Sequence, residues 1–572
     1  MKKKISLLSL LMMLFCLASC VNFVDDFSVD YGDRSGDDFE DTPEAYILSA
    51  STKAASTLPG YGQASNPFLI RNAAELKYFA EATNDGTLHP YAIDPEDEND
   101  LLRQESGDVH VKLMHDIQVD ERYDWIPIGT FAHPVKGSFK GEDHTISGVL
   151  KQDLNITMER DTTGNFNRGS FLAKYGFFGY TGGCEVENLT VAADIIPNRL
   201  VSYSSVGGIT AIAGGGKFTN CTFSGTIENV PHASMQEFYV GSLCGIGERT
   251  EVEGFKSEGT FRLNKFSSVA NKKTFTAKEC CIGGIVGFGI APVYANCENK
   301  TDIVLENFTT TQASIGGIVG RVRYESDPYT MVSITNSGKI SVTNVRHYAA
   351  DMQFPGVYVG GILGYGFLRH EVGKTLNTGD ITVQCTTLPT YVGGICGNVQ
   401  IVRSENIDLY NAGNVTNNST SGYTAGCFGV YYGDAFGATN SGNITSTCEF
   451  CDSVPESGAT GGIVGRGYTQ GCAVLSYLRN EGNITTPEPL ETIHGKQSYA
   501  GSIVGSAAHT NPRTCMNSGK VNGVLTDDPD ISMVGALWLG WERLRYGDED
   551  YQQSSEGQYW EALIRQFITY GN

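Results

Sequence analysis

The sequence of 572 residues is poor in basic residues, in proline and in long apolar runs. Its 41 lysines and arginines are outnumbered by 64 acidic residues, and the formal net charge of −23 disfavours nucleic-acid binding, because phosphate contacts need a basic surface. The 18 prolines are too few for a collagen-like or mucin-like stalk. Since the hydrophobic share of 40% is too high for a disordered chain, we expect a long folded body.

Recognisable metal motifs are also missing. The ten histidines are scattered without an HExxH or HxH spacing, so the sequence contains no familiar zinc-hydrolase motif. Apart from Cys16 and Cys20, the cysteines are odd in number and cannot form a complete disulfide framework. Cys244 and Cys396 fall at one position of a repeat and Cys427 at the next, which favours small buried side chains over reactive thiols. We expect neither a metal nor a cofactor.

The N-terminus contains the longest apolar run. Three lysines precede residues 5–17, and Leu17-Ala18-Ser19-Cys20 follows. A charged start, a short apolar core and small residues at the cleavage site predict a secretory signal peptide over residues 1–19. The apolar run is shorter than the roughly 20 residues that a membrane-spanning helix needs. The Leu-Ala-Ser-Cys sequence resembles the lipobox of bacterial lipoproteins. This resemblance implies acylation of Cys20 and a partner in the outer-membrane lipid.

An acidic segment follows the cysteine. Residues 21–45 contain nine acids and one base, Arg34, a composition that stays solvated and extended. We therefore assign residues 20–59 to the lipidated cysteine and a flexible tether. The segment also resembles the export signal of Bacteroidetes surface lipoproteins, which implies an outer-membrane lipoprotein exposed on the cell surface. A passive tether and retention facing the periplasm remain alternatives.

Glycine is abundant, with 69 residues, or about 12% against a usual share of about 7%. Much of it lies in a repeated hexapeptide, apolar-Gly-Gly-Ile-apolar-Gly, whose copies are 32 to 44 residues apart. A second element, Asn-x-Gly-x-apolar, follows each copy. The hexapeptide has its first glycine at Gly207, Gly241, Gly283, Gly316, Gly360, Gly393, Gly461 and Gly501, with a degenerate copy at Ala425. The second element recurs at Asn336, Asn377, Asn411, Asn440, Asn480 and Asn517, and more loosely at Asn296 and Glu258.

Both elements predict short strands separated by turns. Glycine inside a helix costs about 1 kcal/mol relative to alanine, and the runs after Asn-x-Gly are β-branched, which suits strands. We expect Asn-x-Gly to supply positive-φ positions at a corner and aligned glycines to allow close packing between coils. One period then corresponds to one coil of a β-solenoid of about ten coils, with longer periods bulging at residues 262–281 and 345–356.

The two-part motif is similar to the GLUG repeat of bacterial surface proteins over about residues 60–525. This resemblance implies an all-β, right-handed parallel β-helix with a role in adhesion or surface presentation. The expected organisation is a signal peptide (1–19), a tether (20–59), an N-terminal β-helix segment with its cap (60–175), the repeat β-helix (176–534) and a C-terminal cap (535–572).

Helices are expected only at the two ends, where they cover open strand edges. Residues 72–82 predict a short helix with Asn72 as N-cap and Leu76, Phe79 and Ala80 on one face. Residues 556–568 also have helical spacing, and three of the four tryptophans lie within 535–572. We interpret this segment as a helical cap, with a partner-binding helix as the alternative.

Candidate functional residues follow the glycine motif. Glycoside hydrolysis needs two carboxyl groups at a fixed separation, and the equivalent positions Phe288, Arg321, Tyr365, Asn398, Val430, Arg466 and Ser506 contain none. The residues at and around these positions are aromatic and basic instead. Such side chains can bind sugar rings or carboxylates without catalysing a reaction. Ordinary variation of loop residues is the alternative. The candidate ligand-binding residues are Arg321, Tyr324, Tyr365, Arg369, Tyr431, Tyr432, Arg466 and Tyr468.

The sequence thus favours a non-catalytic cell-surface lipoprotein, whose β-helix acts as an adhesive or ligand-binding module for a glycan or a host or matrix protein. A β-helix polysaccharide lyase or glycoside hydrolase is the enzymatic alternative, and a purely structural cell-envelope spacer is the third.

Overall fold

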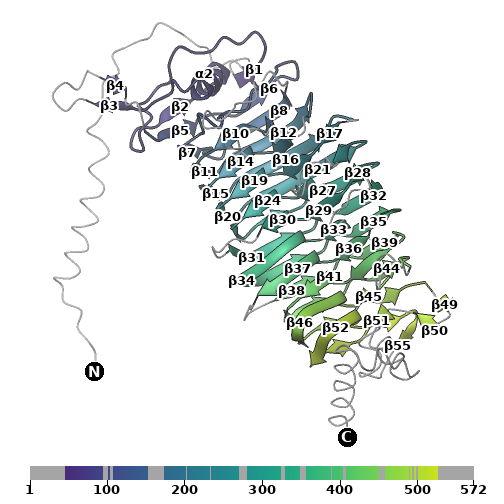
Figure 1. Ribbon diagram of the computed structural model, residues 1–572. Coiled ribbons are helices and arrows are strands. Elements are labelled where there is room, and N and C mark those ends of the chain that lie inside the picture. Colours follow the sequence, from purple (N-terminus) through teal and green to yellow (C-terminus); the bar gives the residue numbers. More distant parts are fainter. Residues whose placement is uncertain are drawn as a thin grey trace, which may run out of the picture. The chain divides into compact units, whose positions relative to one another are not determined.

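The computed structural model divides the chain into two compact units, Met1–Ala45 and Tyr46–Asn572. Every residue whose placement it describes belongs to the second unit (Figure 1). These residues are 46–93, 101–103, 107–152, 173–200, 203–231, 233–268, 280–323, 329–347, 356–387, 389–402, 408–433, 435–449, 458–487, 490–492, 495–497, 500–513 and 515–525.

Parallel strands stack coil upon coil in this unit, which confirms the expected all-β solenoid of β-helix type (Figure 1). The strands form four columns, in which each pairs with its equivalents in the neighbouring coils. Column I is a ten-stranded sheet, in agreement with about ten expected coils. Its strands are β9 (Ala173–Tyr175), β13 (Tyr203–Gly207), β18 (Glu237–Gly241), β23 (Cys280–Gly283), β29 (Gln312–Gly316), β33 (Gly356–Gly360), β36 (Thr390–Gly393), β40 (Gly422–Ala425), β45 (Thr460–Gly461) and β51 (Ala500–Gly501).

Column II follows column I directly after the corner of each coil, which is a double glycine in most copies of the repeat. Its longer members, β34 and β46, continue around the next corner. Its strands are β10 (Phe178–Thr181), β14 (Thr210–Gly214), β19 (Cys244–Glu248), β24 (Val286–Ile290), β30 (Val319–Arg323), β34 (Leu363–Asn377), β37 (Cys396–Val402), β41 (Phe428–Tyr432), β46 (Val464–Ser476) and β52 (Val504–Arg513).

Columns III and IV complete each coil. Column III and the short strands beside it are β2 (Phe68–Ile70), β5 (Val109–Leu113), β7 (Gly137–Lys140), β11 (Glu185–Glu187), β15 (Lys217–Thr219), β20 (Glu251–Glu253), β25 (Val293–Ala295), β26 (Glu298–Asn299), β31 (Tyr329–Asn336), β38 (Leu409–Asn411), β42 (Ala435–Phe436), β43 (Ala438–Asn440), β47 (Arg479–Asn480) and β53 (Met516–Asn517). Column IV is β1 (Ile47–Leu48), β6 (Ile117–Val119), β8 (Thr145–Gln152), β12 (Thr190–Pro197), β16 (Thr222–Glu228), β21 (Lys256–Asn264), β27 (Asp302–Glu306), β32 (Ile340–His347), β35 (Ile381–Cys385), β39 (Val415–Asn417), β44 (Ile444–Ser446), β48 (Ile484–Thr485) and β54 (Lys520–Val521).

A few short strands lie outside the columns. Three pair in parallel at the corner between columns IV and I, namely β17 (Ser234–Met235), β22 (Ser267–Ser268) and β28 (Thr309–Thr310). The antiparallel pairs are β3 (Tyr91–Ile93) with β4 (Leu101–Arg103), β49 (Leu490–Thr492) with β50 (Gly495–Gln497), and β54 with β55 (Val524–Leu525).

The interior follows from the period of two in each strand. In β12, for example, Val191, Ala193 and Ile195 are buried while the residues between them are partly exposed. Equivalent side chains of successive coils therefore stack into one continuous core. Within the described residues, no helix is long and apolar enough to cross a membrane.

The glycine corner between columns I and II behaves as predicted. A Cβ atom on Gly361 would lie closer than 3.0 Å to the carbonyl oxygen of Gly394, and one on Gly394 would meet Gly426 in the same way. The irregular copies also fit, since Ala425 aligns with Gly393 and Gly461, and Gly207 aligns with Gly241. Glycine is favoured here because the backbones of successive coils approach closely, although Ala425, Ser242 and Ser502 show that a small side chain is accommodated in some coils.

The Asn-x-Gly element has a different role from the one predicted. The asparagines of the regular copies do not have positive φ; their side chains are hydrogen-bonded to one another and are buried, apart from the half-buried Asn517. The Asn336 amide donates to Asn377 Oδ1 (2.7 Å) and to the Gly338 carbonyl (3.1 Å), and the same pair of bonds repeats coil after coil. The prediction failed because a buried amide ladder and a left-handed turn both favour asparagine. The ladder contains Asn299, Asn336, Asn377, Asn411, Asn440, Asn480 and Asn517.

Two further details correct the sequence reading of this element. The first ladder asparagine is Asn299, which aligns with Asn336, whereas Asn296 has φ 52° and lies at an outer corner. The left-handed conformation also occurs at Asn188 and Asn220, where the chain turns between columns III and IV. Positive φ is thus supplied by other asparagines than those of the repeat motif.

The N-terminal helix is confirmed. Helix α2 (Ala73–Asn84) begins after Asn72, whose side chain accepts a hydrogen bond from the Glu75 amide at 3.1 Å. Leu76, Phe79 and Ala80 are buried as expected. The C-terminal segment 535–572 lies outside the described residues.

Three predicted boundaries are wrong. Strand β1 pairs with β6, and Leu48 is fully buried, so the β-helix begins inside the stretch 46–59 that we had assigned to the tether. The two bulges are also shorter than expected, because β21 and β22 remain paired up to Ser268, and β32 up to His347. Hydrogen bonding between coils, which composition does not reveal, fixes all three boundaries. Residues 269–279 and 348–355 lie outside the described residues.

Candidate functional site

The predicted aromatic and basic positions do align along the coils. Strand pairing places Phe288, Arg321, Tyr365, Asn398, Val430, Arg466 and Ser506 in one row of column II. A second row, two residues further on, contains Phe367, Gln400, Tyr432 and Tyr468. The expectation that these side chains belong to successive equivalent positions is therefore confirmed.

Three tyrosines of column I, which the sequence reading missed, face the first row. Tyr358, Tyr391 and Tyr423 occupy equivalent positions of β33, β36 and β40. Tyr358 and Tyr391 stack at 4.6 Å between ring centroids, and Tyr391 and Tyr423 lie 5.6 Å apart. The signal was present, since each tyrosine stands two residues before the first glycine or alanine of its motif, on the outward side of the strand.

Arginines lie at both ends of this row of rings. The Arg321 guanidinium lies 4.7 Å from the centroid of Tyr365, whose ring contacts Tyr358 at 4.9 Å. At the other end, Arg466 lies 5.3 Å from the Tyr423 centroid and donates to its hydroxyl at 2.7 Å. We call Arg321, Tyr358, Tyr365, Tyr391, Tyr423, Tyr432 and Arg466 the Tyr–Arg cluster.

Burial divides the cluster into a base and a rim. Tyr358 and Tyr423 are 2% and 1% exposed, whereas the other members keep part of their surface in solvent. Burial, with a smaller contribution from neighbouring tyrosines, raises the pKa of Tyr358 and of Tyr391 above the ordinary value of 10.0. These hydroxyls therefore stay protonated at neutral pH. A ligand would reach the half-buried rim, which the two buried rings support from below.

Tyr431 is a correction to the predicted site. Its side chain is fully buried in the main core and contacts the Phe428 ring at 5.0 Å, because it alternates with the outward-facing Val430 and Tyr432. Strand period thus removes it from any surface. Tyr324 lies outside the described residues, and the side chains of Arg369 and Tyr468 do as well, although their strands β34 and β46 are described.

The cysteines whose side chains the structure describes are buried, apart from the half-buried Cys515. Burial raises the pKa of the Cys184 and Cys221 thiols to about 12 and that of Cys448 to about 11, and it also raises the pKa of Cys244 and Cys396. Hydrogen bonds to the thiols of Cys184, Cys221 and Cys448 only partly offset this effect. The positions support the interpretation of these residues as small core side chains.

The burial of these thiols predicts that the folded protein loses stability at alkaline pH. Below about pH 9 these thiols are protonated in both the folded and unfolded chain, but above it only the unfolded chain releases the protons, so stability should fall as the pH rises from about 9 to 12. Alkylation at pH 8, followed by peptide mass spectrometry, should leave Cys244 and Cys396 unmodified until denaturant is added. Cys515 is the internal control. Rapid native labelling of Cys244 would contradict the prediction.

Clustered metal ligands are not found in the described part of the chain, where no three His, Cys, Asp or Glu side chains converge. In column I itself, Glu237 of β18 accepts a hydrogen bond from the Tyr239 hydroxyl at 2.8 Å.

The comparisons with known proteins give one structural neighbour. No protein-family model matches the chain, and no curated protein matches it. Among solved structures, it is similar to a Bacteroides ovatus protein that is provisionally described as an immunoglobulin A1 protease. The two share 16% identity with a TM-score of 0.34, over 56% of this chain and 78% of the other.

Proposed function

We propose that this protein is an outer-membrane lipoprotein, anchored through an acylated Cys20, whose β-helix is displayed on the cell surface as a non-catalytic ligand-binding module. The lipobox-like sequence before Cys20 supports the anchor, and the acidic residues 21–45 support surface export. The similarity of the repeats to the GLUG repeat favours adhesion or surface presentation.

The observation that carries the binding role is the Tyr–Arg cluster. Its half-buried rim presents the faces or edges of Tyr365, Tyr391 and Tyr432 together with two guanidinium groups. Tyrosine rings and the paired N–H donors of guanidinium groups bind sugar rings, carboxylates and extended protein segments. Equivalent positions repeat at about 4.8 Å along the coils, which suits an extended ligand such as a glycan or a matrix protein.

Substitutions at the rim test this role. Tyr365→Ala and Arg466→Ala should each weaken binding by about tenfold on an array of glycans and matrix proteins, because each removes a contact group while leaving the main core intact. Arg479→Ala is the matched control, since Arg479 lies in the same coil but pairs with Glu481 at 2.7 Å in column III. Full retention of binding by both rim variants would remove the cluster from the proposal.

The enzymatic alternative requires its own assay. The purified protein should release no new reducing ends and no unsaturated sugars from neutral or acidic polysaccharides. Depolymerisation above that of a heat-inactivated sample would contradict the non-catalytic role and favour the lyase or hydrolase.

Anchoring and display are tested in cells. Cys20→Ala should abolish incorporation of labelled fatty acid, because the thiol is the acylation site. Replacing Asp25, Asp26 and Asp30 together by alanine should protect the protein from protease added to intact cells, as the export signal is lost. Unchanged protease accessibility in that triple variant would argue against a role of the acidic segment in export.

A further inference from the structure

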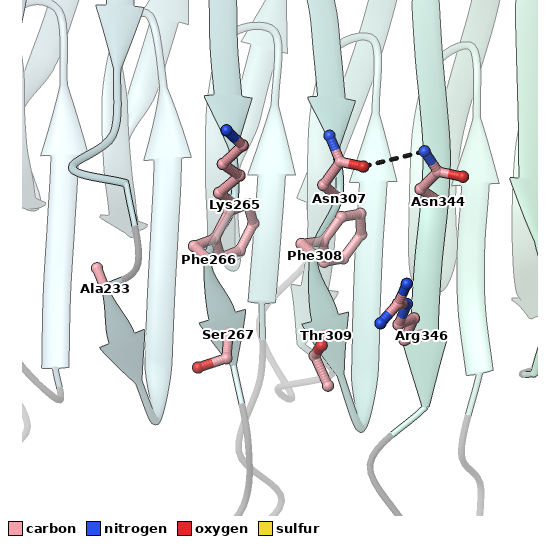
Figure 2. A pocket seen from close by; sticks show the side chains of 9 residues that line it. All are labelled: Ala233, Lys265, Phe266, Ser267, Asn307, Phe308, Thr309, Asn344 and Arg346. Carbon is pink, nitrogen blue, oxygen red and sulfur yellow. Dashed lines mark hydrogen bonds between the residues drawn. The ribbon is translucent and has the colours of Figure 1, made fainter.

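A cavity of about 500 Å³ opens at the corner between columns IV and I, within the size range of ligand pockets (Figure 2). It lies beside β22 and β28, at the end of β32, and shares no residue with the Tyr–Arg cluster. Its floor is formed by Phe266 and Phe308, whose rings stack at 5.1 Å and 7°. Ala233 takes the position of Phe266 in the preceding coil, because its carbonyl accepts a hydrogen bond from the Ser267 amide. Its small side chain leaves space in the cavity.

Two rows of polar side chains border this floor. Lys265, Asn307 and Asn344 form the first row at the corner itself, and Figure 2 shows them on one side of the phenylalanine rings. Ser267, Thr309 and Arg346 form the second row on the other side, aligned by the pairing of β22, β28 and β32. The side chains thus provide hydroxyl and amide groups between two cations at diagonally opposite corners.

Lys265 is unusual in its row. It has φ 51°, and the equivalent residues Asn307 and Asn344 each have φ 54°. Asparagine adopts this left-handed conformation readily, whereas an unbranched charged residue does so at a cost of about 1 kcal/mol. A lysine at this place therefore carries strain that an asparagine would relieve, and such strain tends to mark functional positions.

The charge of the cavity contrasts with that of the chain. No carboxylate lines it, although the whole sequence has a net charge of −23. Neither Lys265 nor Arg346 forms an ion pair with any residue that the structure describes. Other exposed cations of the same coils do, since Arg262 pairs with Glu228 at 3.5 Å and Lys300 with Glu258 at 3.2 Å. Two exposed cations are thus available to an anionic ligand.

We propose that this cavity binds an acidic glycan through its carboxylate or sulfate groups. Lys265 and Arg346 bind anionic groups, while Ser267 and Thr309 bind sugar hydroxyls. The Asn307 amide is already hydrogen-bonded to Asn264 and Asn344, so it orders the first row and is not counted as a contact group. The two cations are two coils apart, about 10 Å along the solenoid, which is comparable to the length of a disaccharide. This inference rests on the proposed ligand-binding function and names a class of ligand for a second site on the same β-helix.

Lys265→Asn and Arg346→Gln provide the test in the full-length chain. By calorimetry with oligosaccharides of a polyuronate or of a sulfated glycan, each variant should bind about tenfold more weakly than the unmodified protein, and added salt should weaken binding further. Lys265→Asn should also fold at least as stably, because asparagine relieves the left-handed strain, so that its loss of binding is not a loss of structure. Arg262→Gln, in β21 three residues before Lys265 but outside the cavity, is the matched control.

The ligand series separates the possible sources of the anionic group. Preference for the polyuronate identifies a carboxylate and preference for the sulfated glycan a sulfate, and either result supports the site. Equal binding of polyglutamate, or unchanged glycan binding in both cavity variants, overturns it. If the cavity variants bind normally while Tyr365→Ala does not, the proposed function stands without this site; if no glycan or matrix protein binds at all, the proposed function fails with it.

Discussion

Replacing Asn411 by aspartate is expected to destabilise the β-helix by about 3 to 5 kcal/mol. The Asn411 amide donates to Asn440 Oδ1 at 2.7 Å and to the Gly413 carbonyl at 2.9 Å, and its oxygen accepts from Asn377 at 2.8 Å. A carboxylate there would face two acceptors inside a core position that is fully buried. Because protonation restores one donor, the loss of stability should be smaller at acidic pH than at neutral pH.

The comparison is made by urea denaturation and by hydrogen exchange of the coils on either side. Asn443→Asp is a matched control, since its oxygen already accepts from the backbone and side-chain amides of Asn483 at the exposed corner. That variant should stay within about 0.5 kcal/mol of the unmodified protein. If Asn411→Asp were as stable as Asn443→Asp at neutral pH, the ladder would not be an essential part of the core.

Replacing Gly394 by alanine should cost about 3 kcal/mol or more. The new Cβ would lie closer than 3.0 Å to the carbonyl oxygen of Gly426 in the next coil and to the Asn411 side chain. Both neighbours are held by hydrogen bonds between coils, so that neither can move without separating strands. The clash therefore acts on the glycine corner and on the asparagine ladder together.

Gly373→Ala is the control for this prediction. Gly373 lies in β34, and its nearest neighbour for an added Cβ is a Val332 methyl group at 3.8 Å, an ordinary contact. This variant should unfold at an unchanged or slightly higher urea concentration, because alanine restricts the unfolded chain. Equal stability of the two variants would mean that the corner can widen freely, against the close approach of successive coils.

The local pattern of the sequence predicted much of the fold. Glycine at a fixed register implied coils in close contact, and β-branched runs implied strands, because both depend on short-range backbone and side-chain sterics. The Asn72 cap and the buried face of helix α2 followed from residues three and four apart. The row from Phe288 to Ser506 was predictable for the same reason, since a repeat with a constant register must align its equivalent positions.

Contacts between coils decided what the sequence could not. Asparagine favours both left-handed turns and buried amide ladders, and only the hydrogen bonds from Asn336 to Asn377 distinguish the two. Tyr431 and Tyr432 are adjacent in sequence, yet strand period buries the first and leaves the second at the rim. The tyrosines of column I join Arg321 and Arg466 because the glycine corner brings columns I and II together and because the arginines contact tyrosines of neighbouring coils.

The sequence by itself thus determined the repeat and the all-β fold class. It also determined that few basic residues are available to form a cationic site. Tertiary structure alone decided where the few cations stand. Lys265 and Arg346 are separated by 80 intervening positions in the printed sequence, but stacking at about 4.8 Å per coil places both at one cavity. Long-range register, which no local propensity encodes, is the physical reason.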